Sequence, residues 1–161
     1  MTFEHNAAEC LGCSQGMEAV HKKLMDTIIE RGHAVASIHG SEDGPPFSYT
    51  VGRTLKGRPE LFITGPIDAR IQMAILNDAV RVDEETPLKP GQERDGLLQR
   101  FSTRIVEIDP QAASMFVARN FFGDDVRALQ IVWPDPDGRF PGDPRFSFPA
   151  DHQPVFTKGG S

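Results

Sequence analysis

The chain has 161 residues, of which 17 are Lys or Arg and 23 are Asp or Glu, so its formal net charge is -6 at pH 7. An acidic chain lacks the positive field with which proteins bind nucleic acid or anionic lipid, and we expect neither as a partner. The mean hydropathy of -0.35, without a long apolar run, excludes a predicted membrane span. We expect one domain over residues 1–157 with a short tail over residues 158–161. Because no signal peptide precedes the domain, the predicted location is cytoplasmic.

An amphipathic helix is predicted over residues 15–31. Apolar residues recur there at helical spacing, and charged residues occupy the other side. Ser14 is a suitable N-cap and Gly32 a suitable residue after the last turn. The apolar residues of the stripe are Met17, Val20, Leu24, Met25, Ile28 and Ile29.

Three short segments after this helix have the composition of β-strands. They cover residues 33–38, 47–51 and 60–64, and they are rich in aromatic and β-branched side chains. The stretch 40–46 between the first two contains two glycines and two prolines, which favour a turn. We therefore expect three strands in antiparallel succession.

Helical spacing returns over residues 68–82, which predicts a second helix. A fourth strand is expected over residues 101–108 and a fifth over residues 128–133. Short edge strands are expected at residues 146–148 and 155–156 in the proline-rich end of the chain.

Between the fourth and fifth strands, Asp109-Pro110 provides an N-cap and a first helical position. A third helix is predicted from there to Gly123. Its expected inward residues are Ala113, Phe116, Val117 and Phe121.

The resulting order is α-β-β-β-α-β-α-β. Three consecutive strands without an intervening helix argue against a doubly wound parallel sheet. The predicted fold class is α+β, a largely antiparallel sheet of about five to six strands covered by three helices.

Several segments resemble a known bacterial family: PPFSYTVG at residues 45–52, RPELFITG at 58–65, ALQIVWPD at 128–135, DGRFP at 137–141, and Gln153-Pro154. With them, residues 10–156 resemble the domain of unknown function 4262 family. The resemblance implies one intact domain and supplies no activity. The chain departs from the family pattern with Arg53 where leucine is usual and Arg58 where histidine is usual.

The two segments FSYTVG and ELFITG are also similar in rhythm to the paired strands of split-barrel flavin reductases. That resemblance implies a flavin cofactor. The residues themselves leave the cofactor unknown.

Cys10 and Cys13 form a C-x-x-C, the spacing with which two thiolates reach one zinc ion or form a redox pair. A structural zinc needs four ligands, so His5 and His21 would have to complete the site. A redox pair normally follows a strand, and none is predicted before Cys10. Metal ligands, a redox pair and two thiols without a chemical role remain open alternatives.

The connection 52–58 contains three cations and two glycines in an otherwise acidic chain. Arginines contact anions in a bidentate manner, and glycines allow backbone N–H groups to approach an anion. Our leading hypothesis is a small anionic molecule bound there, and the alternative is a solvated loop. The predicted contacts are Arg53, Lys56 and Arg58, with Tyr49, Gln130 and Trp133 as the pocket wall.

A second hypothesis is an enzyme. Tyr49 is the only tyrosine, and its hydroxyl needs a partner if it is buried, for which Glu60 or Gln130 is suitably placed. In this hypothesis Glu60 is the general acid or base and Tyr49 orients it, with a flavin if the second resemblance holds.

A third hypothesis is a protein-interaction module. Phe140, Phe146, Phe148 and Phe156 in the proline-rich end would offer an apolar surface for a partner or for a homodimer.

Overall fold

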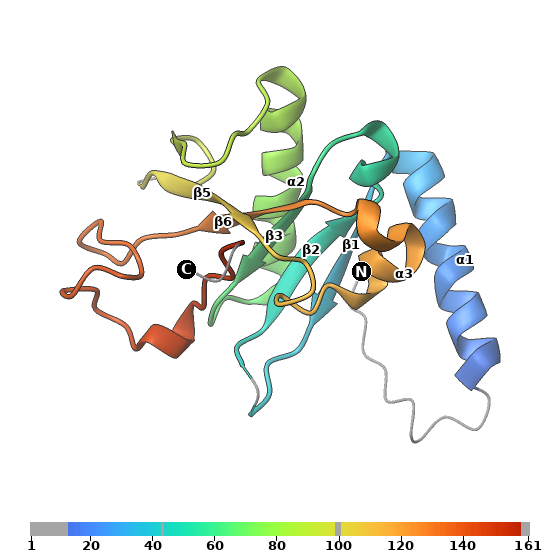
Figure 1. Ribbon diagram of the computed structural model, residues 1–161, viewed down its shortest axis with the longest axis horizontal. Coiled ribbons are helices and arrows are strands. Elements are labelled where there is room, and N and C mark those ends of the chain that lie inside the picture. Colours follow the sequence, from blue (N-terminus) through green and yellow to red (C-terminus); the bar gives the residue numbers. More distant parts are fainter. Residues whose placement is uncertain (1–12, 43, 99–100, 159–161) are drawn as a thin grey trace.

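The computed structural model describes residues 13–42, 44–98 and 101–158 (Figure 1). Within them the chain forms three α-helices and one sheet of six strands. No helix among these residues is long and apolar enough to cross a membrane. In chain order the elements are α1 (Cys13–Arg31), β1 (Ala34–Ile38), β2 (Phe47–Val51), β3 (Glu60–Thr64), α2 (Ala69–Glu85), β4 (Glu93–Arg94), β5 (Thr103–Ile108), α3 (Phe116–Phe122) and β6 (Ala128–Val132).

The sheet has the strand order β1-β2-β3-β6-β5-β4. β1, β2 and β3 follow one another antiparallel, with Ala36 opposite Tyr49 and Tyr49 opposite Phe62. β6 pairs parallel with β3 and antiparallel with β5. The predicted α+β class, the element order and the antiparallel succession of the first three strands are confirmed. The two-residue strand β4 is an addition, too short to leave a periodic signal in the sequence.

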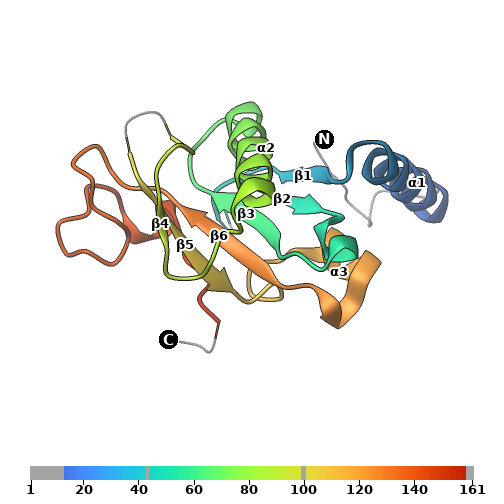
Figure 2. The same cartoon turned by 90° about the horizontal axis from the view of Figure 1, so that it is seen from above.

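Alternating side chains of the strands build two separate cores. Leu61 and Ile63 of β3 point toward α2, where they pack with Leu76. Phe62, between them, packs on the opposite face with Tyr49 and with residues of α1 and α3. Figure 2 shows α2 over one face of the sheet, α3 near the other face, and α1 beside the β1 edge. Alternate side chains of β3 therefore belong to two apolar layers, one on each face of the sheet.

Among the residues of the predicted apolar stripe of α1 whose side chains are described, only some are buried. Leu24 and Ile28 pack into the core below α3, whereas Ile29 is 77% exposed and Met25 also reaches the surface. Because α1 lies at the edge of the sheet, only a narrow face of the helix packs against the rest of the domain (Figure 2).

The third helix begins later than predicted. α3 starts at Phe116, and residues 110–114 form a turn in which Asp109 caps the N–H of Gln111 at 2.9 Å. Ser114 adopts φ 58, which interrupts a helical path. The prediction that Phe116 faces inward is wrong, because the delayed start leaves this side chain 64% exposed.

The C-terminal segment contributes no strand at residues 146–148 or 155–156, where edge strands were predicted; it forms an isolated bridge between Thr157 and Ile108. Buried glutamine side chains hold it instead. Gln130 donates to the Pro154 carbonyl at 2.8 Å and accepts from the Phe156 N–H at 3.2 Å. Gln153 pairs with both backbone groups of Trp133. Side-chain amides thus satisfy backbone groups that a strand would have paired.

Trp133 closes the α2 side of the sheet against Gly65. The indole N–H donates to the Thr64 carbonyl at 2.8 Å, and the ring lies where a side chain at position 65 would stand. Gly65 also has φ +132, a conformation that L side chains rarely adopt. Both steric demands require glycine at this position.

We predict that Gly65→Ala lowers the free energy of unfolding by about 3 kcal/mol, because the new Cβ would displace the Trp133 ring and strain the backbone. The matched control is Gly91→Ala, which also has positive φ but meets nothing within 4 Å. Its expected loss is about 1 kcal/mol. Urea denaturation followed by tryptophan fluorescence measures both, and equal losses would contradict the packing explanation.

Candidate functional site

The connection between β2 and β3 wraps around a carboxylate of the chain itself. It contains the short 3-10 helix η2 (Arg53–Lys56), with Gly52 and Gly57 at positive φ on either side. Glu60 is fully buried behind this turn. Its oxygens accept from the Thr50 and Thr54 hydroxyls at 2.8 and 2.6 Å. They also accept from the backbone N–H groups of residues 52, 53 and 54 at 3.2, 3.2 and 2.8 Å.

Asp83 of α2 is the second buried carboxylate at this connection. Arg58 donates to both of its oxygens, at 3.0 and 2.6 Å, and the Leu88 N–H donates at 2.8 Å. Buried Arg53 forms a further ion pair with it. Desolvation by itself would raise the pKa of Asp83, but the hydrogen bonds from Arg58 and Leu88 and the two guanidinium charges lower it below its ordinary value. The same carboxylate raises the pKa of Arg58, against a smaller desolvation effect.

The anion contacts predicted from the sequence therefore occupy different positions. Arg53 is buried, Arg58 is 33% exposed at its side chain, and Lys56 is 50% exposed with its Nζ 4.0 Å from Glu84. The structure adds Arg127, whose Nη2 donates to the Gly57 carbonyl at 2.9 Å. Sequence reasoning missed Arg127 because 70 residues separate it from Gly57, and no local pattern links the two.

Tyr49 lies on the α3 side of the sheet and is buried. Its hydroxyl accepts the N–H of Val117 at 3.1 Å, and within the described chain no hydrogen bond joins it to Glu60 or Gln130, the partners considered from the sequence. Burial raises the pKa of Tyr49 above its ordinary value; the Val117 N–H opposes this and the Glu60 charge adds to it. The hydroxyl is therefore protonated throughout the physiological pH range.

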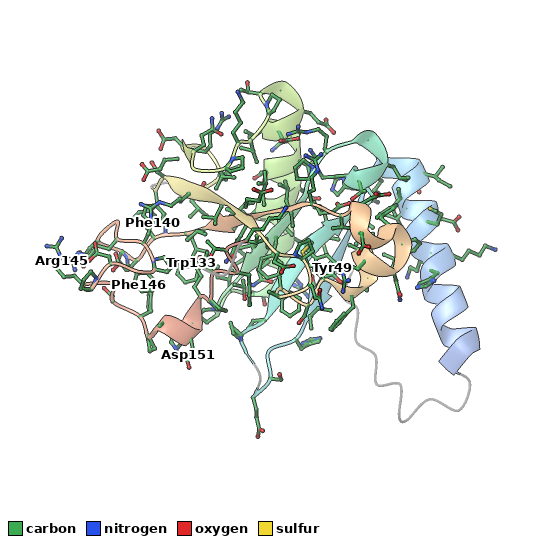
Figure 3. All side chains as sticks on the ribbon, in the orientation of Figure 1. Tyr49, Trp133, Phe140, Arg145, Phe146 and Asp151 are labelled. Atoms are coloured by element: carbon green, nitrogen blue, oxygen red, sulfur yellow. The ribbon has the colours of Figure 1, made fainter. Side chains whose placement is uncertain are left out.

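A cavity of about 360 Å³ opens beside Tyr49. Its walls come from the end of the β1–β2 hairpin, the segment before α3, and the C-terminal segment at Pro154 and Phe156. Figure 3 places Tyr49 beside α3, away from Trp133. Most of the lining is apolar or aromatic, and Ser114 and Phe116 belong to it. The volume lies in the range of small-molecule sites in proteins.

Gln130 and Trp133, predicted as pocket wall together with Tyr49, do not line this cavity within the described residues. Both bind the C-terminal segment, as described above. Trp133 belongs to the core on the α2 side of the sheet, whereas Tyr49 belongs to the core on the α3 side. Gln130 is in register with Tyr49 across Phe62, and its partners Pro154 and Phe156 line the cavity.

The metal prediction falls largely outside the described residues. Cys10 is not among them, and Cys13 is the first residue of α1, with a side chain that is not described. In the part of the chain that is described, no three His, Cys, Asp or Glu side chains could hold one metal ion. The zinc and redox alternatives for the cysteine pair therefore remain predictions.

We predict that Asp83→Asn lowers the free energy of unfolding by about 3 kcal/mol near pH 7, because Arg53 and Arg58 lose their counter-ion. The folded-state pKa of Asp83 lies below that of the unfolded chain. Ionised Asp83 therefore stabilises the fold above the ordinary carboxyl pKa of about 4, and this stability is lost as the pH falls through the folded value. The variant should lack this part of the acid dependence.

Denaturant unfolding between neutral and acid pH measures this difference. Asp78→Asn is the matched control, because Asp78 is on the same helix and pairs with Arg81 at the surface. A small loss of stability with an unchanged acid dependence is expected for the control. The prediction fails if the two variants give parallel curves.

Comparison with known proteins identifies a family and no activity. No curated protein matches the chain. Among solved structures, one from Neisseria gonorrhoeae FA 1090, described as a SUFU (suppressor of fused protein) homolog, matches with 13% identity and a TM-score of 0.44 over 76% of this chain and 80% of that chain. The family model of the domain of unknown function DUF4262 matches residues 27–147. Because this match covers more than half of the sequence, the chain belongs to the DUF4262 family.

Proposed function

We propose that this domain binds a small molecule in the cavity beside Tyr49. The observation that supports the proposal is the cavity itself, about 360 Å³ with a mostly apolar and aromatic lining and a few polar groups. Binding sites for small molecules typically combine these properties. Tyr49, Ala113 and Val117 of its lining also belong to the packed core on the α3 side of the sheet.

Two features of the segment before α3 support the same proposal. Ser114 has φ 58, and it is the one non-glycine residue with positive φ in the described chain. Such conformations are maintained at some energetic cost and are enriched at functional sites. Phe116, two residues later, exposes an aromatic ring next to the cavity. Both residues line the hollow.

The test is a variant that fills the cavity. Ala112 is exposed and lines it, so Ala112→Trp should fill the opening without disturbing the core. The matched control is Ala19→Trp, an exposed alanine on α1. A library of ring fragments is screened by amide chemical shifts of isotope-labelled protein. We expect fragments that shift the amides of Phe47, Val117 and Phe156 to bind at least tenfold more weakly to Ala112→Trp and unchanged to Ala19→Trp.

Fragments that shift these three amides equally in both variants would overturn the proposal. So would a screen in which no fragment shifts them at millimolar concentration.

We propose anion binding near the connection 52–58 as a second candidate function. The observation that favours it is the grouping of Lys56, Arg58 and Arg127 around Gly57 in a chain of net charge -6. Arg53 would act indirectly, because it is buried against Asp83. A phosphate or carboxylate would meet the surface cations and not the turn N–H groups, which Glu60 already engages.

Pyrophosphate titration tests this candidate. We expect shifts at the Leu55 and Gly57 amides, and about tenfold weaker binding to Lys56→Gln combined with Arg127→Gln. Arg58 is left intact because it holds Asp83. The control replaces two exposed cations elsewhere, Lys22→Gln with Arg70→Gln. Equal weakening in the two double variants would indicate a net-charge effect and contradict a site.

The enzyme and interaction hypotheses gain no support from the geometry. Glu60 already accepts five hydrogen bonds, four from residues 52–54 of the turn and one from Thr50 of β2, and the hydroxyl of Tyr49 bonds to α3. In the C-terminal segment, Phe148 packs edge-on against both Trp133 and Phe146, and Phe140 lies under the Arg104 guanidinium. Catalysis, a flavin and a homodimer remain predictions.

A further inference from the structure

We propose that the cavity beside Tyr49 takes a neutral, flat ring compound that carries a hydrogen-bond acceptor. This inference rests on the proposed function and names the chemical class of its ligand. It is carried by the charge of the lining, the arrangement of the aromatic rings and the state of one buried hydroxyl.

The lining favours an uncharged ligand. Among the described residues around the cavity there is no Asp, Glu, Lys or Arg, and the one histidine, His39, is exposed at its rim. The cations near Gly57 lie beyond the other end of β2, because the hairpin 39–46 precedes this strand and the connection 52–58 follows it. A ligand carboxylate or phosphate would lose its hydration in the cavity without gaining an ion pair to a lysine or arginine of the lining. Burying an unpaired charge is far more costly than burying a neutral polar group.

The ring arrangement favours a flat ligand. Phe47 and Tyr49 stack with centroids 6.2 Å apart and planes 17° apart. Phe62 packs 5.4 Å from Phe47 and meets Phe156 edge-on at 5.7 Å. Phe47, Tyr49 and Phe156 all line the cavity, so three aromatic rings contribute to its wall. An added ring gains offset or edge contacts with such rings in addition to the burial of its area.

Phe116 supplies the opposing contact. Its ring is 64% exposed and has no ring partner among the described aromatic residues. An exposed phenylalanine at the rim of an apolar cavity can bury its area when a second ring enters. We therefore assign Phe116 as the residue that covers the bound ring.

The Tyr49 hydroxyl requires an acceptor on the ligand. It accepts the Val117 N–H, but no described residue accepts its own proton. A buried donor without an acceptor is unfavourable, and a ligand carbonyl or ring nitrogen would remove this cost. Because burial raises the pKa of Tyr49, the hydroxyl keeps this proton for donation.

Three matched probes test the inference: indole-3-carboxamide is neutral with an acceptor, indole-3-carboxylate is charged, and 3-methylindole has no such acceptor. Amide shifts at Val117 and Phe156 locate binding, and calorimetry gives Kd. We expect the carboxamide to bind about tenfold more tightly than the carboxylate and roughly threefold to tenfold more tightly than 3-methylindole.

Two variants separate the contributions. Tyr49→Phe keeps the ring and removes the hydroxyl, so the Kd ratio of 3-methylindole to carboxamide should fall to about one, whereas loss of the Val117 bond alone would weaken both probes equally. Phe116→Ala changes an exposed side chain and should weaken all three probes about tenfold without unfolding the domain. The control Leu55→Ala removes an exposed apolar side chain in η2 and should change none.

The outcomes distinguish this inference from the function on which it rests. Tighter binding of the carboxylate, or an acceptor preference that survives Tyr49→Phe, overturns the ligand class and leaves the cavity as a binding site. No shift at Val117 and Phe156 with any probe at millimolar concentration overturns the ligand class, while the fragment screen with Ala112→Trp still decides the proposed function. Shifts that are confined to other amides likewise overturn the ligand class.

Discussion

The structure depends on two buried carboxylates, Glu60 and Asp83, gathered at one end of β2. Glu60 fixes the turn 52–54 by accepting its N–H groups, and Asp83 holds Arg53 and Arg58 against α2. Buried charges are stable only when such partners surround them. The ion pairs of Asp83 attach the β2–β3 connection to the end of α2 and so fix how the helix lies on the sheet.

The opposite end of β2 has a different character. There the hairpin 39–46, the strained segment at Ser114 and the C-terminal residues Pro154 and Phe156 surround a cavity that no side chain fills. β2 thus joins an end held by ion pairs of Asp83 to an end that borders the cavity. Figure 1 shows the hairpin projecting from the sheet on the side away from the β2–β3 connection. Substitutions in the lining of the cavity would therefore leave the interactions at the charged end in place.

The sequence of residues 52–58 indicated that this connection holds an anion, but it did not indicate which anion. Cations and glycines predict that an anion is held there, and two anions are held there, both belonging to the chain. Composition cannot distinguish a bound carboxylate from a carboxylate of the protein that folding delivers from 25 or 30 residues away. For the same reason the sequence did not predict the contact of Arg127 with Gly57 or the hydrogen bond between Tyr49 and Val117 of α3.

The sequence by itself determined the helices and strands with clear periodicity, their order and the α+β class, because hydrophobic spacing and turn residues act over a few neighbouring positions. Only the tertiary structure decided the late start of α3, the exposure of Ile29 and Phe116, and the cavity beside Tyr49. Each of these follows from which surfaces meet across the sheet. That meeting is set by contacts between segments distant in the chain, and no local pattern of residues records it.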